Sequence, residues 1–238
     1  MPGIDPAPVC SGVVELIWIR HGQPAWSVDG LAIDDPALTA LGKQQAIHLG
    51  KRFADLEVDH LFVSPLLRAQ QTMEPIAEAL GVVPETLPWL AEIAAPVWEG
   101  TPTDQVEAVF DSSRRRPLDE LWDGIPGGES FRDFHARVTN GLCALITDLG
   151  AERVHDAPPL WRLDRDVGRV VLVAHAGTNS VSLGSLLGID PVPWEWERFV
   201  SHHAAMSTVR LIEMSDAHTF SLFRFADTAH LPDELHTV

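Results

Sequence analysis

"LIWIRHGQPAW", residues 16–26, carries an apolar run directly into Arg20 and His21, and this junction decides the fold. The whole run, "VVELIWI" at 13–19, is short and rich in β-branched side chains. Such runs are typical of parallel strands that are covered on both faces. We therefore expect a buried central strand that ends at a cation and an imidazole. Two further runs have the same character: "HLFV" at 60–63 and "RVVLVA" at 169–174.

Helical patterns separate and follow these strands. Thr39 is a candidate N-cap for a stripe of small and apolar residues within 42–53, and a second stripe over 69–80 ends at Gly81. Ser130, followed three residues later by an acid, opens a third helix, and a fourth follows the third strand. Strands that alternate with helices predict an α/β fold, here a three-layer α/β/α sandwich with a mostly parallel central sheet.

We interpret residues 1–238 as a single domain. Two stretches fit the alternation poorly and are expected to be surface excursions, at about 94–128 and 151–168, the first a candidate partial lid. Near the end of the chain, "MSTVRLIEM" at 206–214 and "FSLFRF" at 220–225 alternate in polarity, which predicts a β-hairpin.

Composition excludes several classes of function. The 34 acidic residues outnumber the 17 Lys and Arg residues, for a net charge of −17, which argues against nucleic acid and anionic membranes as partners. The first dozen residues lack a basic start and an apolar signal core, so we expect a cytoplasmic protein. Cys10 and Cys143 have no metal-site or disulfide-framework spacing. Any anionic substrate therefore needs a local cluster of cations.

The polar residues that follow the three strands predict such a cluster. Arg20 and His21 follow the first strand, Ser64 and Arg68 follow the second, and His175 ends the third and opens a helix. Ligands of open parallel sheets bind beyond the carboxyl ends of the strands. Guanidinium groups and a helix N-terminus at one such edge favour a phosphate group.

Seven motifs occur in the order found in the histidine phosphatase superfamily, which includes the cofactor-dependent phosphoglycerate mutases, and the chain resembles that family. The motifs are "RHGQ" (20–23), "DPALTALGKQQA" (35–46), "SPLLRAQQT" (64–72), "LAEIAAPVWEG" (90–100), "PGGESF" (126–131), "VAHAGT" (173–178) and "HAAMSTVRL" (203–211). Each motif alone is a weak signal, but the ordered set spans most of the chain.

The resemblance implies a role for each matching residue. His21 would be the nucleophile that becomes phosphorylated, and Arg20, Arg68 and His175 would hold the phosphoryl oxygens. Glu92 would protonate the leaving oxygen and then activate water. No metal and no cofactor is implied, and the expected ligand is a small phosphorylated metabolite. A homodimer would be unsurprising.

Four positions depart from the family pattern at the expected border of the pocket. Gln23 replaces a common Glu, and Ala176 replaces a common Gly; both are expected to border the bound phosphate. Pro96 replaces a Gly before "WEG", and His203 stands where Asn is expected. None of these changes removes a catalytic group, so we expect them to affect the substrate and not the reaction.

Several alternatives stay open at this stage. The acid could be Glu99 in place of Glu92, and the cluster Arg114–Arg116 could attract a second anionic group of a substrate. Asp34–Asp35 and His202–His203 lack the spacing of a metal site. The chain could also be a phosphoglycerate mutase or a phospholigand-binding module without catalysis. Four tryptophans could line a pocket for an apolar leaving group: Trp26, Trp98, Trp194 and Trp196.

Overall fold

The computed structural model describes residues 14–238, so Cys10 and the expectation about the first dozen residues lie outside it. In the described part, one eight-stranded sheet has the order β5-β4-β8-β1-β9-β10-β7-β6. Its strands are β1 (Val14–Arg20), β4 (His60–Val63), β5 (Glu85–Thr86), β6 (Ala151–Asp156), β7 (Pro159–Leu163), β8 (Gly168–Ala174), β9 (Met206–Met214) and β10 (Ala217–Asp227). The three strands expected at its centre are β1, β4 and β8, which are neighbours.

Most strands of this sheet point the same way. β5, β4, β8 and β1 pair in parallel, whereas β9 is antiparallel to β1, β10 to β9, β7 to β10 and β6 to β7. Two successive reversals restore the direction, so β10 and β6 also run with β1, and β9 and β7 run against it. The carboxyl ends of β1, β4 and β8 therefore meet at one edge, as expected from the sequence.

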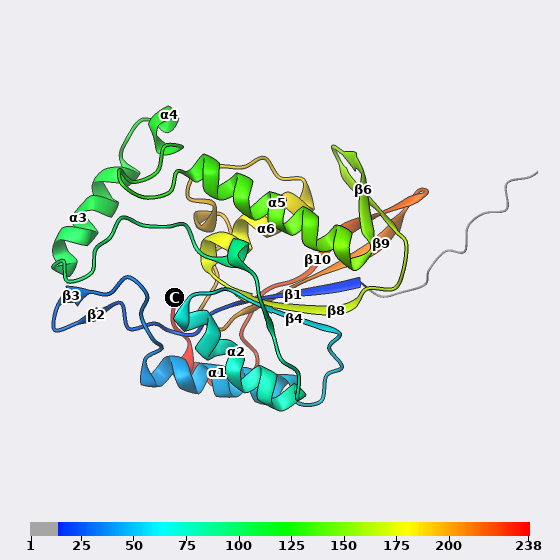
Figure 1. The fold of residues 1–238 in the computed structure, drawn as a ribbon, viewed down its shortest axis with the longest axis horizontal. Coiled ribbons are helices and arrows are strands. Elements are labelled where there is room, and N and C mark those ends of the chain that lie inside the picture. The colour runs from blue at the N-terminus through cyan, green and yellow to red at the C-terminus, as the bar shows by residue number, and fades with distance from the viewer. Residues whose placement is uncertain (1–13) are drawn as a thin grey trace, which may run out of the picture.

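Helices cover both faces of the sheet (Figure 1). α1 (Ala40–Phe53) and α2 (Leu67–Leu80) lie on one face, and α5 (Phe131–Leu149) and α6 (Ala176–Leu187) lie on the other. The predicted caps are present: Thr39 Oγ1 accepts from Gly42 N, Ser130 Oγ accepts from Asp133 N, and Gly81 is left-handed at φ 66°. The predicted three-layer α/β/α sandwich is confirmed.

Alternate residues of β1 explain why the run at its centre is apolar on both sides. Leu16 and Trp18 belong to the core beneath α5 and α6, and Ile17 and Ile19 belong to the core beneath α1 and α2. All four side chains are buried. Because a core covers each face of this strand, residues 16–19 are apolar on both faces and do not alternate between apolar and polar.

Within residues 151–168, expected to be a surface excursion, residues 151–163 form the β6–β7 hairpin at the edge of the sheet. Trp161 of β7 is buried and packs against Phe220 of β10, with ring centroids 5.6 Å apart.

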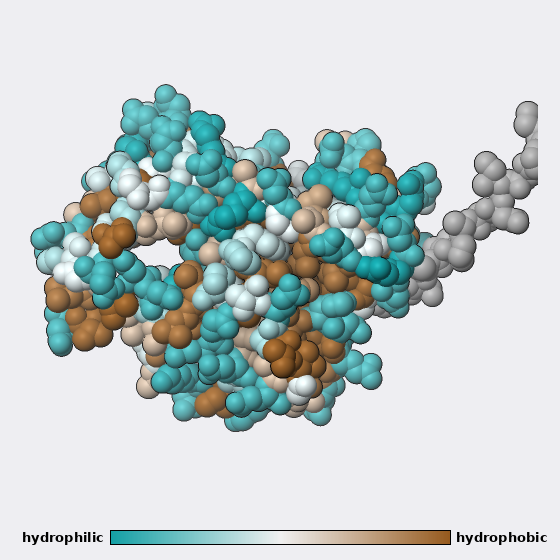
Figure 2. All heavy atoms as spheres, viewed as in Figure 1, coloured by the Kyte–Doolittle hydropathy of each residue, from teal (hydrophilic) through white to brown (hydrophobic). Residues whose placement is uncertain are grey.

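The stretch 94–128 does leave the sandwich, and it carries α3 (Thr103–Arg114) and α4 (Leu118–Leu121). Figure 2 shows an opening between this excursion and the rest of the molecule. None of the helices within 14–238 combines the length and apolar character required to cross a membrane.

Short elements complete the described chain. β2 (Ser27–Val28) and β3 (Leu31–Ala32) form a two-stranded sheet of their own after β1. Three 3-10 helices are η1 (Pro88–Leu90), η2 (Glu195–Glu197) and η3 (Asp233–Leu235). Backbone bonds from Ala32 N to Thr101 O (2.8 Å) and from Thr103 N to Gly30 O (3.0 Å) join the β2–β3 sheet to the start of α3.

Candidate active site

His21 follows β1 directly and is 4 % exposed. Its Nδ1 lies 2.7 Å from the carbonyl oxygen of Gly22. Because a carbonyl oxygen only accepts, Nδ1 carries the proton and Nε2 presents a lone pair. Burial, and next the charge of Arg68, lower the pKa of His21 well below its usual value. The imidazole is therefore neutral at physiological pH.

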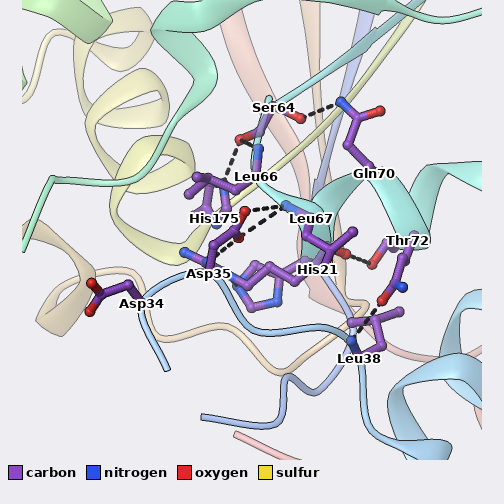
Figure 3. A network of polar contacts seen from close by, with 12 residues as sticks. His21, Asp34, Asp35, Leu38, Ser64, Leu66, Leu67, Gln70, Thr72 and His175 are labelled. Carbon is purple, nitrogen blue, oxygen red and sulfur yellow. Dashed lines mark hydrogen bonds and ion pairs between the residues drawn. The ribbon is translucent and has the colours of Figure 1, made fainter. Parts of the chain in front are cut away.

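Arg68 lies in the first turn of α2, where it is 3 % exposed. Its Nε donates to Nε2 of His21 at 3.3 Å, and its Nη1 lies 3.4 Å from Oδ1 of Asp35. Asp35 also accepts from the backbone N–H of Leu67, at 3.0 and 3.2 Å for its two oxygens (Figure 3). Asp35 thus holds both the start of α2 and its arginine. The sequence raised Asp35 only as a metal-ligand candidate and missed this role.

Arg20 ends β1 and contacts His203, which follows η2 along the chain. Nη2 of Arg20 is 3.1 Å from Nε2 of His203, Nη1 donates to the Ser201 carbonyl, and Nε is buried without a partner. Burial lowers the pKa of Arg20 to about 10, so it stays charged at neutral pH. Burial and the charge of Arg20 lower the pKa of His203 to about 3. Neutral His203 donates from Nδ1 to Thr237 Oγ1 (2.9 Å) and accepts from Arg20.

His175 caps α6 at the end of β8 and is completely buried. Ser64 Oγ accepts from the backbone N–H of Leu66 at 3.3 Å and lies 2.7 Å from His175 Nε2 (Figure 3). The hydroxyl can donate to Nε2 or accept from it, and the other ring nitrogen, Nδ1, is buried without a partner in the described structure. The His175 ring centroid is 5.1 Å from that of His21. A second buried nitrogen at these strand ends therefore lacks a hydrogen-bond partner.

Glu92 approaches the same edge from the loop after η1. Its Oε2 accepts from Gly177 N in the first turn of α6 at 2.9 Å, and its Oε1 accepts from Ile93 N at 3.0 Å. Burial raises the pKa of Glu92, and the two backbone donors, Arg68 and Arg20 oppose that shift without cancelling it. The carboxyl group is therefore suited to carry a proton.

Glu99, the alternative acid, lies elsewhere. It is exposed, and its Oε2 accepts from the backbone N–H of Asp34 at 3.0 Å. Asp34 in turn accepts from Trp98 N at 2.9 Å, so both acids brace the loop before α1 against the excursion. Of the two glutamates, Glu92 is the one in contact with the start of α6.

A cleft of about 450 Å³ opens beside these residues. Its described lining includes Arg20, Gln23, Trp26 and His203. Ala176 is the first residue of α6, where backbone N–H groups have no partner within the helix. Among residues 14–238, no group of three His, Cys, Asp or Glu side chains is placed to hold a metal ion.

Three of the four tryptophans pack in a cluster with phenylalanines. Trp98 contacts Phe110 of α3, Phe110 contacts Trp194, and Trp194 contacts Trp196, with centroids 5.1, 6.0 and 5.2 Å apart. Arg114 adds to this contact: its guanidinium lies 4.9 Å from the Trp194 ring centroid, and it pairs with Glu197 at 2.9 Å. The cluster fastens the excursion to η2, which explains these tryptophans by packing.

Curated relatives match part of the chain. Probable phosphoglycerate mutase GpmB of Erwinia tasmaniensis is 33 % identical over 140 residues, which are 57 % of this chain and 64 % of that protein. The same protein of Salmonella choleraesuis is 31 % identical over 137 residues, 56 % of this chain and 64 % of the relative. The matches thus span less than two thirds of the length of these curated relatives.

Solved structures share the fold. A mycobacterial glucosyl-3-phosphoglycerate phosphatase is 24 % identical with a TM-score of 0.67, covering 91 % of this chain and 100 % of that one. A putative alpha-ribazole-5'-P phosphatase from Escherichia coli is 22 % identical with a TM-score of 0.66, covering 90 % and 97 %. The histidine phosphatase superfamily (branch 1) matches residues 16–217, from β1 to the start of β10. The chain therefore belongs to the histidine phosphatase superfamily, branch 1.

Proposed function

We propose that the chain hydrolyses phosphate monoesters through a phosphohistidine formed on His21. The observation that carries this proposal is a pair of buried nitrogens without a hydrogen-bond partner, Arg20 Nε and His175 Nδ1, at the strand ends where Arg68 meets His21. An unsatisfied buried donor costs about 1–3 kcal/mol. A bound phosphoryl group would supply acceptors to Arg20 Nε and Arg68, and to His175 when its ring proton is on Nδ1.

The first step transfers the phosphoryl group to the imidazole. With the ester bound, Nε2 of His21 exchanges its contact with Arg68 for the phosphorus atom and attacks in line with the leaving oxygen. The P–O bond to the leaving group breaks, and Glu92 donates its proton to the departing oxygen. Arg20 and Arg68 neutralise the charge on the equatorial oxygens, which is where phosphoryl transfer needs stabilisation.

The second step returns the site to its starting state. Glu92, now a carboxylate, takes a proton from a water molecule, and the water oxygen attacks phosphorus as the P–N bond to His21 breaks. Inorganic phosphate leaves, and Glu92 is again protonated. The proton on Nδ1 of His21, held by the Gly22 carbonyl at 2.7 Å, keeps Nε2 as the reacting nitrogen in both steps.

A second candidate is phosphoglycerate mutase activity, which the names of the 31–33 % identical relatives suggest. A mutase would return the phosphoryl group to a rearranged ligand in place of water. Activity on 3-phosphoglycerate that depends on added 2,3-bisphosphoglycerate would favour the mutase. Hydrolysis of several esters without this addition would favour the phosphatase.

The test is phosphate release from p-nitrophenyl phosphate and a panel of metabolite monoesters, with EDTA present, by the wild type and His21→Ala. We expect turnover in the wild type that is lost in the variant. A wild type that binds phosphate esters without releasing phosphate would instead indicate a binding module. A variant that keeps full activity would exclude His21 as the nucleophile.

A further inference from the structure

The cleft beside the phosphate site has an aromatic wall. Trp26 is 51 % exposed, and it lines the same cleft as Arg20 and His203. Its ring centroid lies 4.8 Å from the guanidinium carbon of Arg68, which contacts the candidate nucleophile. A group attached to a phosphoryl bound by these two arginines would therefore leave the site past the indole ring.

The backbone on either side of Trp26 is fixed. Ala25 N donates to Ala37 O at 2.8 Å, and Ile33 N donates to Trp26 O at 3.0 Å. The β2–β3 sheet follows immediately, and the start of α3 braces it through the bonds described above. A half-exposed indole on a braced loop is a preformed apolar surface, since binding a ring there orders little of the chain.

The lining of the cleft is otherwise nearly uncharged. Among its described lining residues, Arg20 is the one with a full positive charge, because His203 is neutral. Gln23 contributes an amide whose Oε1 accepts from Thr39 Oγ1 at 2.8 Å. Arg114 of the excursion pairs with Glu197, and Arg116 donates to the Gly124 carbonyl. A carboxylate on the leaving group would compete with the phosphate for Arg20, and the net charge of −17 adds repulsion.

We propose that the substrates of this site are phosphomonoesters with an uncharged leaving group whose ring stacks on Trp26. The inference rests on the proposed function and narrows it to a substrate class. The ring must be uncharged and must have one face free of substituents, because that face packs on the indole. Phosphoglycerate, which carries a carboxylate and no ring, falls outside this class.

Benzyl phosphate and ethyl phosphate test the stacking, because both release a simple primary alcohol. We expect kcat/KM of the wild type to be about tenfold higher for benzyl phosphate, which is the size of effect that one aromatic contact produces. Trp26→Leu should reduce this ratio to about twofold, and Trp26→Phe should keep most of it. If Trp26 only supports Arg68, both substrates lose the same factor and the ratio is unchanged, which overturns the proposal.

Glycerol 3-phosphate and 3-phosphoglycerate test the charge requirement at similar size. We expect the uncharged glycerol leaving group to give the higher kcat/KM, with the difference shrinking as salt is added. Faster hydrolysis of 3-phosphoglycerate would contradict the proposal.

Calorimetry with the non-hydrolysable benzylphosphonate and ethylphosphonate separates this inference from the proposed function. If the wild type releases no phosphate from any ester, hydrolysis fails as the function. Tighter binding of benzylphosphonate, lost in Trp26→Leu, would still support the ring site. Equal binding of the two phosphonates would overturn it.

Discussion

Replacing Glu92 by Gln should separate leaving groups by their need for a proton. The amide keeps an oxygen for one of the two N–H donors, Gly177 or Ile93, and its NH2 group faces the other, a change that all substrates share. The difference between substrates therefore reports the acid itself, for which we expect a loss of about 10²–10⁴-fold in kcat/KM with an alkyl phosphate. p-Nitrophenolate leaves without a proton, and its ester should lose less than about tenfold.

The same assignment of the acid predicts the direction in which kcat/KM changes with pH. Because burial raises the pKa of Glu92, the wild type should hold the required proton to higher pH than an ordinary carboxyl and lose kcat/KM as pH rises through that raised pKa. The ratio of wild type to Glu92→Gln, measured on one substrate, cancels the titration of the substrate. Glu99→Gln is the matched control, because the Glu99 carboxylate is exposed and accepts from the backbone of Asp34. Equal losses for alkyl and p-nitrophenyl esters, or a larger loss in Glu99→Gln, would refute the assignment of the acid.

Three other substitutions follow from the contacts. Gly177→Ala would place a methyl group 2.4 Å from Glu92 Oε1, so steady-state kinetics should show the leaving-group pattern of Glu92→Gln; an unchanged pattern would argue against this contact. His203→Asn keeps an acceptor for Arg20 and should raise KM less than His203→Leu, for which we expect about tenfold; equal KM values would contradict the acceptor role. Asp35→Asn weakens a half-exposed ion pair with Arg68 and should raise KM about two- to fivefold, and a loss of kcat alone would disagree.

The centre of the fold was predictable because a strand covered on both faces is a short, continuous apolar run rich in β-branched residues. β1, β4 and β8 and the caps at Thr39 and Ser130 were identified from local sequence. The hairpin at 151–163 was not, since its sequence "AERVHDAPPLWRL" mixes charges and prolines with few apolar residues. An edge strand buries little, so its pattern is weak, and only pairing with β10 defines it.

The site was predictable where chain position alone brings residues together. The parallel pairing of β1, β4 and β8 places Arg20, His21 and His175 at one edge, with Arg68 in the helix that follows. The support of Arg68 by Asp35 was not predictable, because the two lie 33 residues apart and the aspartate is in a loop without periodicity. Tertiary contacts of this kind leave no local signal.

The central claim is the covalent phosphohistidine, and trapping it tests the account most directly. Glu92→Gln, given p-nitrophenyl phosphate, should form the adduct and hydrolyse it slowly, because the base of the second step is missing. Intact-protein mass spectrometry after an alkaline quench, with peptide mapping, should find one phosphoryl group, on His21, and none in the Glu92→Gln, His21→Ala double variant. Turnover by the wild type with no adduct on His21 in either protein, or an adduct on His175 instead, would contradict the mechanism.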